Sequence, residues 1–105
     1  MIIVGFELVA ALVARERKLR PQLGKTLDRR AAAWKAEMGR AQWTKPTEVK
    51  AVFGTADVIG GNRVVFDLCG NNYRIVVLFS YVVGVARIRF YGSYAEYDKI
   101  DATKV

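Results

Sequence analysis

Residues 63–91 read RVVFDLCGNNYRIVVLFSYVVGVARIRFY, and this stretch predicts most of the sheet. It contains three runs rich in β-branched and aromatic residues, which are typical of strands. The four-residue connections between the runs, CGNN and YVVG, are of the length that joins neighbouring antiparallel strands. The stretch therefore predicts three antiparallel strands: RVVFDL (63–68), YRIVVLFS (73–80) and VARIRFY (85–91).

The lengths of the two connections predict which residues lie opposite one another. With Cys69–Asn72 as the first connection, Leu68 faces Tyr73 and Asp67 faces Arg74. With Tyr81–Gly84 as the second, Arg74 faces Tyr91, Val76 faces Arg89 and Leu78 faces Arg87. Opposed residues share a sheet face. One face is then nearly all apolar and must be the core face: Val64, Phe66, Leu68, Tyr73, Ile75, Val77, Phe79, Ala86, Ile88 and Phe90. The other carries the polar set: Arg63, Val65, Asp67, Arg74, Val76, Leu78, Arg87, Arg89 and Tyr91.

Helices are predicted on the N-terminal side of these strands. After a short strand at 1–4, apolar residues recur at helical spacing over 5–19 and again from Pro21 to Met38. The segment WTKPTEVKAVFG (43–54) contains a break and a helical turn, and Ser93 with Glu96 forms a capping-box pattern that begins a short helix through AEYDKIDA. The prediction is an α+β fold in one domain, 1–105, with a helical hairpin packed on a twisted antiparallel sheet and a short C-terminal helix.

The composition of the chain excludes several kinds of catalytic and metal site. The 105 residues include 17 Lys and Arg against 10 Asp and Glu, a net charge of +7, and no histidine. Histidine-based catalysis and HExxH zinc sites are thereby excluded, and the single cysteine excludes an internal disulfide. We predict no cofactor and no metal site. The apolar opening MIIVGFELVAALVA is shorter than a membrane span and contains Glu7, so we expect a soluble, cytoplasmic protein with no membrane partner.

The positive charge is concentrated in 15–50, which holds eleven Lys and Arg against four acids, whereas the remainder of the chain is balanced. A basic helical region suits a polyanionic partner, although simple solvation explains it as well.

The polar sheet face gathers four arginines that only Asp67 offsets. Arginine presents a planar fork of donors matched to phosphate oxygens, so this face is a candidate phosphate-binding surface. The alternative is an ordinary solvated face with cross-strand ion pairs. Tyr91, Tyr94 and Tyr97 follow at the rim, where a base could stack, or where they are simply half-buried. We take as RNA-binding candidates Asp67, Arg87, Tyr91 and Lys50.

The segments NRVVFDL, GNNYRIVVLF and IRFYGSYAEYDKID, together with WTKPTEVKAVFG and the helical hairpin, resemble the HigB toxins of bacterial type II toxin–antitoxin pairs, a branch of the RelE/ParE superfamily. The resemblance covers nearly the whole chain, and its most specific piece is GSYAEYDKI. It implies a toxin that cuts mRNA on the ribosome without a metal. It also implies a helix-turn-helix antitoxin of the HigA type as partner.

The resemblance also implies roles for individual residues. Arg74 matches the sheet arginine at the scissile phosphate, Arg63 and Arg89 match basic positions near the RNA, and Tyr97 matches the terminal-helix tyrosine with acid–base or stacking roles. Relatives usually read GTHAEYD where this chain reads GSYAEYD, so Tyr94 replaces a histidine. If that histidine is catalytic, this chain cuts slowly, works through tyrosine, or has lost cleavage.

The reaction implied is attack of a ribose 2′-hydroxyl on the neighbouring phosphate. Arg74, with Arg63 or Arg89, suits charge stabilisation, and Tyr97 and Tyr94 are the candidates for proton transfer. Because neither side chain is a good base at neutral pH, either the arginines lower a tyrosine pKa or the ribosome supplies the acceleration by positioning the RNA, which we favour. Two alternative functions remain: a ParE-like toxin acting on a protein such as DNA gyrase, and an RNA-binding module without cleavage.

Overall fold

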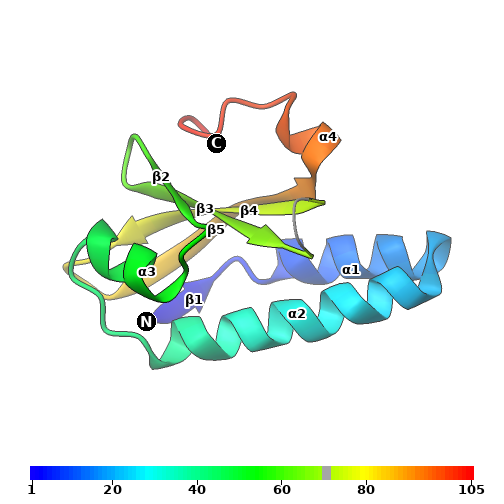
Figure 1. Cartoon of the computed structure of the whole chain (residues 1–105), viewed down its shortest axis with the longest axis horizontal. Coiled ribbons are helices and arrows are strands. Elements are labelled where there is room, and N and C mark those ends of the chain that lie inside the picture. Colours follow the sequence, from blue (N-terminus) through cyan, green and yellow to red (C-terminus); the bar gives the residue numbers. More distant parts are fainter. Residues whose placement is uncertain (70–71) are drawn as a thin grey trace.

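The computed structural model describes residues 1–69 and 72–105 and places a mixed five-stranded sheet between two layers (Figure 1). The long helices α1 (Glu7–Leu19) and α2 (Pro21–Arg40) lie along one face as an antiparallel hairpin. The short helix α4 (Tyr94–Tyr97) and the C-terminal segment lie on the opposite face. The predicted α+β class, helical hairpin and short C-terminal helix are therefore confirmed.

The sheet order is β1-β5-β4-β3-β2. The three predicted strands are β3 (Arg63–Leu68), β4 (Tyr73–Ser80) and β5 (Val85–Ser93), and they pair with one another antiparallel. At one edge β1 (Ile2–Val4) runs parallel to β5, so the sheet is mixed and not wholly antiparallel as predicted. At the other edge β2 (Asp57–Ile59) pairs with β3. No strand was predicted there from the sequence.

The predicted register holds throughout the β3–β4 hairpin, where Asp67 lies opposite Arg74. Its connecting turn includes residues 70 and 71, which are outside the described part of the chain. In the β4–β5 hairpin the prediction holds from Ser80–Val85 to Val77–Ile88 and then fails, because a β-bulge shifts the register between Val76 and Val77. A bulge inserts one extra residue into a strand and so moves every following side chain to the other face.

The helices bury a continuous apolar face against the sheet. Trp34 of α2 packs edge-on against Phe66, with ring centroids 5.5 Å apart. Gly24 allows the hairpin to close, because a Cβ there would lie 2.5 Å from the Cα of Arg17. The core drawn from both layers includes Val9, Leu12, Leu27, Trp34, Met38, Val64, Phe66, Ile75, Val77 and Phe79.

The opposite sheet face is organised as rows of cross-strand neighbours. Its centre is covered, since Val65 and Val76 are 1% and 0% exposed. The cover is provided on this side by α4 and the segment that follows it, which ends near β2 and β3 (Figure 1). Beyond Tyr97 the chain continues in turns, so the predicted helix through AEYDKIDA is shorter than expected. The rows are Asp67–Arg74–Gly92, Asp57–Val65–Val76–Phe90 and Ile59–Arg63–Leu78–Arg87.

Candidate nucleic-acid interface

Arg74, on the α4 side of the sheet, is held by an ion pair and a hydrogen bond. Its Nε lies 3.0 Å from Oδ1 of Asp67, and Nη1 donates to the carbonyl oxygen of Tyr73 over 3.3 Å. The side chains of Arg74 and Asp67 are 11% and 20% exposed, so both are held in place rather than free in solvent. The cross-strand position that the sequence predicts for this pair is thus also a side-chain contact.

Helix α4 places two tyrosines beside this arginine. The Cζ of Arg74 lies 4.9 Å from the ring centroid of Tyr94, within the range of a cation–π contact. The backbone N–H of Tyr94 donates to the carbonyl of Asn72 over 2.9 Å, which ties the start of α4 to the start of β4. Tyr94 remains 51% exposed, so a guanidinium and an accessible aromatic ring are available together at this surface.

Tyr97 lies in the same neighbourhood and is half-buried. Its ring is tilted against Phe90, with centroids 6.4 Å apart. Burial raises the pKa of Tyr97, and the carboxylate of Asp57 raises it further, while Arg74 opposes them in part. Arg74 therefore does not bring the pKa of the Tyr97 phenol below its ordinary value, so lowering of a tyrosine pKa by the arginines is not supported for Tyr97. The Tyr97 phenol is therefore protonated at neutral pH.

The predicted convergence of four arginines is wrong. Arg63 lies at the opposite end of β3 from Asp67, and four residues of strand correspond to about 13 Å. Its Nε and Nη2 donate to the backbone oxygen of Val105, over 3.0 and 2.7 Å, and Nη1 donates to Gly61. Arg63 holds the C-terminal segment and does not join Arg74.

The bulge in β5 overturns the predicted positions of three more residues. Arg89 does not face Val76 but lines a surface hollow of about 310 Å³ with residues of α1. Tyr91 lies opposite Ile75 on the core face, packed edge-on against Tyr73 and 8% exposed. Phe90, predicted in the core, lies instead opposite Val76 on the α4 side.

Arg87 and Lys50 lie apart from the Arg74 cluster, which consists of Arg74, Asp67, Tyr94 and Tyr97. Arg87 is exposed opposite Leu78, in the row that contains Arg63. Lys50, on α3 (Pro46–Val52), donates from Nζ to the carbonyl of Ala56 over 2.7 Å. The structure thus assembles Arg74, Asp67, Tyr94 and Tyr97, and it leaves the other candidates elsewhere.

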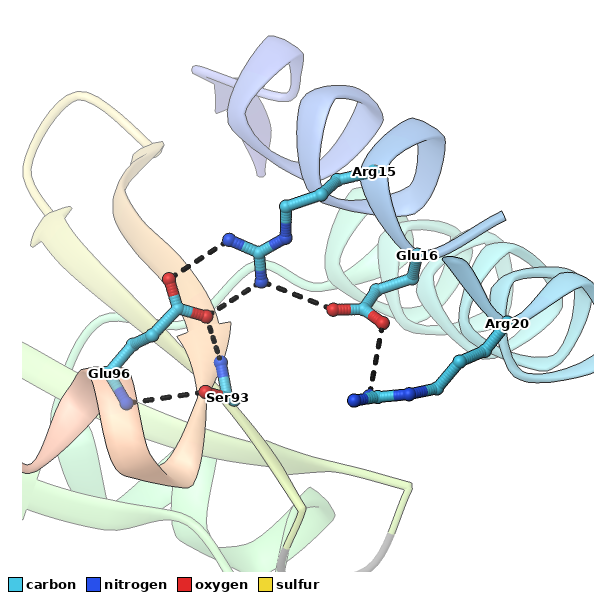
Figure 2. A network of polar contacts seen from close by, with 5 residues as sticks. All are labelled: Arg15, Glu16, Arg20, Ser93 and Glu96. Carbon is cyan, nitrogen blue, oxygen red and sulfur yellow. Dashed lines mark hydrogen bonds and ion pairs between the residues drawn. The ribbon is translucent and has the colours of Figure 1, made fainter. Parts of the chain in front are cut away.

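Sequence reasoning missed a polar network that fixes α4. The guanidinium of Arg15 on α1 binds both carboxylate oxygens of Glu96, at 3.0 and 2.7 Å, and Glu96 also completes the capping box with Ser93 (Figure 2). The capping box itself is confirmed. No local pattern signals the contact with Arg15, because the two residues are 81 positions apart.

Two further findings concern metal sites and membrane-spanning helices. Within the described ranges, no group of three His, Cys, Asp or Glu side chains is arranged to hold a metal ion. Among the helices described, none combines the length and apolar character needed to cross a membrane.

Comparison with known proteins identifies the family. The sequence matches the family described as HigB toxin, the RelE-like toxic component of a toxin–antitoxin system, over residues 28–100. This range includes Arg74, Asp67 and both α4 tyrosines. No match was found among curated proteins. Because the match spans well over half of a chain whose fold is the one expected of RelE-like toxins, the protein belongs to the HigB toxin family and acts as the toxin of a toxin–antitoxin pair.

Proposed function

We propose that this toxin is an endoribonuclease that cuts mRNA on the ribosome. The observation that carries the proposal is the placement of Arg74, a nearly buried guanidinium oriented by Asp67 with the exposed ring of Tyr94 beside it. A guanidinium offers paired donors to phosphate oxygens, and an accessible aromatic ring offers a stacking surface for an unpaired base. RNA presents both groups within one nucleotide, and single-stranded RNA is the form in which bases are free to stack.

The chemistry that suits this arrangement is transesterification within the RNA. The 2′-oxygen forms a bond to phosphorus while the bond from phosphorus to the 5′-oxygen breaks, which leaves a 2′,3′-cyclic phosphate and a free 5′-hydroxyl. Negative charge develops on the phosphorane oxygens, where Arg74 would stabilise it. The proton lost by the 2′-hydroxyl must be accepted and another must be given to the leaving oxygen.

Tyr97 is suited to only one of these proton transfers. Since its pKa is raised, the phenol is protonated at neutral pH and can donate to the leaving 5′-oxygen. It is a poor acceptor for the 2′-hydroxyl proton. The main acceleration is therefore assigned to alignment of the RNA by the ribosome, which can contribute on the order of 7–11 kcal/mol. Tyr94, in place of a histidine, serves here as a stacking surface and a support for Arg74.

The basic helical hairpin gives this toxin a second charged surface. Its exposed cations without a described carboxylate partner include Lys25, Arg29 and Arg30 of α2. We assign them to ribosomal RNA, which places the site of action in the cytoplasm, where translation occurs. We also assign the neutralising partner to a helix-turn-helix antitoxin of the HigA type.

The test is to induce the toxin and map the 5′ ends of cellular mRNA. Wild type should produce new 5′-hydroxyl ends within translated regions, and Arg74→Ala should abolish them while ribosome binding persists. Lys104→Ala, an exposed cation outside the site, is the control for the loss of one positive charge. Intact transcripts with arrested DNA replication would instead favour a ParE-like action on gyrase. RNA binding that Arg74→Ala removes, with no cleavage by wild type, would favour a binding module.

A further inference from the structure

A bidentate ion pair connects the helical hairpin to α4 across the edge of β5. Nη1 of Arg15 lies 3.0 Å from Oε2 of Glu96, and Nη2 lies 2.7 Å from Oε1 (Figure 2). Paired, charge-assisted hydrogen bonds of this kind are stronger and more directional than single contacts. They fix both the distance and the orientation between α1 and α4.

Arg15 is itself oriented from its own helix. Its Nη2 lies 3.2 Å from Oε1 of Glu16, a carboxylate that is 3% exposed and whose other oxygen lies 3.4 Å from Arg20 (Figure 2). A buried carboxylate with partners on both oxygens is a rigid support. Glu16 therefore helps to hold the guanidinium of Arg15 in the orientation in which it contacts Glu96 of α4.

Helix α4 depends on such a support. It has four residues, too few to persist as an isolated helix in water. Glu96 stabilises it from inside by accepting the N–H of Ser93 over 3.1 Å, and the same carboxylate accepts both bonds from Arg15. The contact with Arg15 lowers the pKa of Glu96 to about 2, so this carboxylate is charged at every physiological pH.

We propose that Arg15 is a positioning residue for RNA cleavage: by holding Glu96 it keeps α4 in place, so that Tyr94 and Tyr97 stay beside Arg74. The inference rests on the proposed function. Arg15 acts through Glu96 because both of its terminal nitrogens are engaged by carboxylates. Loss of the contact should displace the two tyrosines while leaving Arg74, held by Asp67, where it is.

The decisive variants are Arg15→Gln, Arg15→Lys and Glu96→Gln. Glutamine at position 96 retains an oxygen for the capping box but loses the charge that attracts Arg15. Lysine at position 15 retains the charge but not the paired geometry. Arg17→Gln is the matched control, because Arg17 lies on the same helix and forms an ion pair of 2.8 Å with Asp28 of α2 rather than with Glu96.

The first readout is the rate of cleavage on programmed ribosomes. We expect Arg15→Gln to lower kcat by about 10- to 100-fold with KM within about twofold of the control, because misplacement of reacting groups slows chemistry more than binding. Arg15→Lys should recover part of kcat. The double variant Arg15→Gln/Glu96→Gln should be no worse than the poorer single variant, since both remove one interaction.

The second readout is amide exchange at Asp98, whose N–H closes α4 on the carbonyl of Tyr94 at 2.9 Å. Arg15→Gln should speed this exchange by about threefold to fivefold, and Arg17→Gln should not. If wild type cleaves and Arg15→Gln keeps its kcat, or exchange is unchanged, the inference about Arg15 is overturned and the proposed function stands. If wild type cleaves no transcript, the proposed function fails, and the role of Arg15 in cleavage fails with it.

Discussion

The side chain of Arg74 is 11% exposed, so part of it reaches the surface while the rest is held in one orientation. Asp67 contributes the orientation, through the 3.0 Å contact to Nε, and leaves the two terminal nitrogens directed elsewhere. An orienting carboxylate reduces the reorganisation that binding would otherwise require. At the scale of single residues, the site is therefore a pre-arranged guanidinium and not a free surface charge.

Asp67 should also contribute to stability. In Asp67→Ala the guanidinium of Arg74 stays largely buried without its carboxylate, and we expect the free energy of unfolding to fall by about 1–3 kcal/mol. Asp67→Asn should cost less, because the amide oxygen still accepts from Nε. Urea denaturation of both variants measures the difference. Equal stability of wild type and Asp67→Ala would show that solvent satisfies Arg74 equally well.

Gly92 lies opposite Arg74, and the space at its Cα is occupied. A Cβ there would lie 2.6 Å from Cζ of Phe90, so Gly92→Ala must displace that ring and with it the packing against Tyr97. We expect a loss of about 1–3 kcal/mol in thermal or urea unfolding. Gly39→Ala is the control, because Gly39 is helical with open space around its Cα, and it should gain up to about 1 kcal/mol. A neutral Gly92→Ala would contradict this account.

At the scale of elements, α4 is the part of the site held by the fewest contacts of its own. It packs on β4 and β5, begins at the Ser93 cap and is tied to α1 through Glu96. The element that brings Tyr94 and Tyr97 to the site is thus stabilised mainly from outside itself. Conditions that weaken these ties should affect the site before they affect the sheet.

Acid titration tests this dependence. The pKa of Glu96 is about 2 in the folded protein against 4.5 for the free group, so its contribution is full above pH 4.5 and is lost as the pH falls toward 2. Glu96→Gln should therefore be less stable than wild type at pH 6, by at most about 1 kcal/mol because the pair is partly exposed, and the difference should shrink at pH 3. Urea unfolding at both pH values measures it. The control is Glu37→Gln, which removes an exposed ion pair with Arg40 and shows how much an ordinary surface pair contributes to stability. If the stability difference between wild type and Glu96→Gln is the same at pH 6 and pH 3, the stabilising role of the Glu96 carboxylate is refuted.

At the scale of the molecule, the two charged surfaces lie on opposite sides of the sheet. The basic hairpin forms one layer and α4 lies on the other side of the sheet (Figure 1), where Arg74 contacts the ring of Tyr94. The two approach each other where α1 meets α4. The proposed function uses both sides, with ribosomal RNA assigned to the hairpin and mRNA to Arg74.

Binding to ribosomes should accordingly depend on salt in proportion to the phosphates that are neutralised. Replacing Lys25 and Arg29 together with glutamine should lower the slope of log K against log salt by roughly 1.5–2. Cleavage by the ribosome-bound toxin should keep its kcat. Sedimentation binding at several salt concentrations, with Lys99→Gln/Lys104→Gln as a charge-matched control, measures the slope. An unchanged slope would assign the basic hairpin face to solvation alone.

Local periodicity in the sequence was enough to predict the β3–β4 register, the apolar face of the sheet up to the bulge, the helical hairpin and the Ser93 cap. It could not reveal the bulge. In IRFY (88–91) both alternations place an aromatic residue inward, so the pattern does not distinguish Phe90 from Tyr91. Only tertiary packing decides which ring is buried.

Contacts between segments far apart in the sequence were likewise not predictable from local patterns. Arg63 holds Val105, and Arg15 holds Glu96, across separations that carry no local signal. The sequence does not show whether an arginine is paired with a carboxylate, a carbonyl or a phosphate. It therefore placed these arginines on helices and strands but did not identify their partners. The fold assigned them, because the partner of a charge depends on which side chains the packed core brings within about 4 Å.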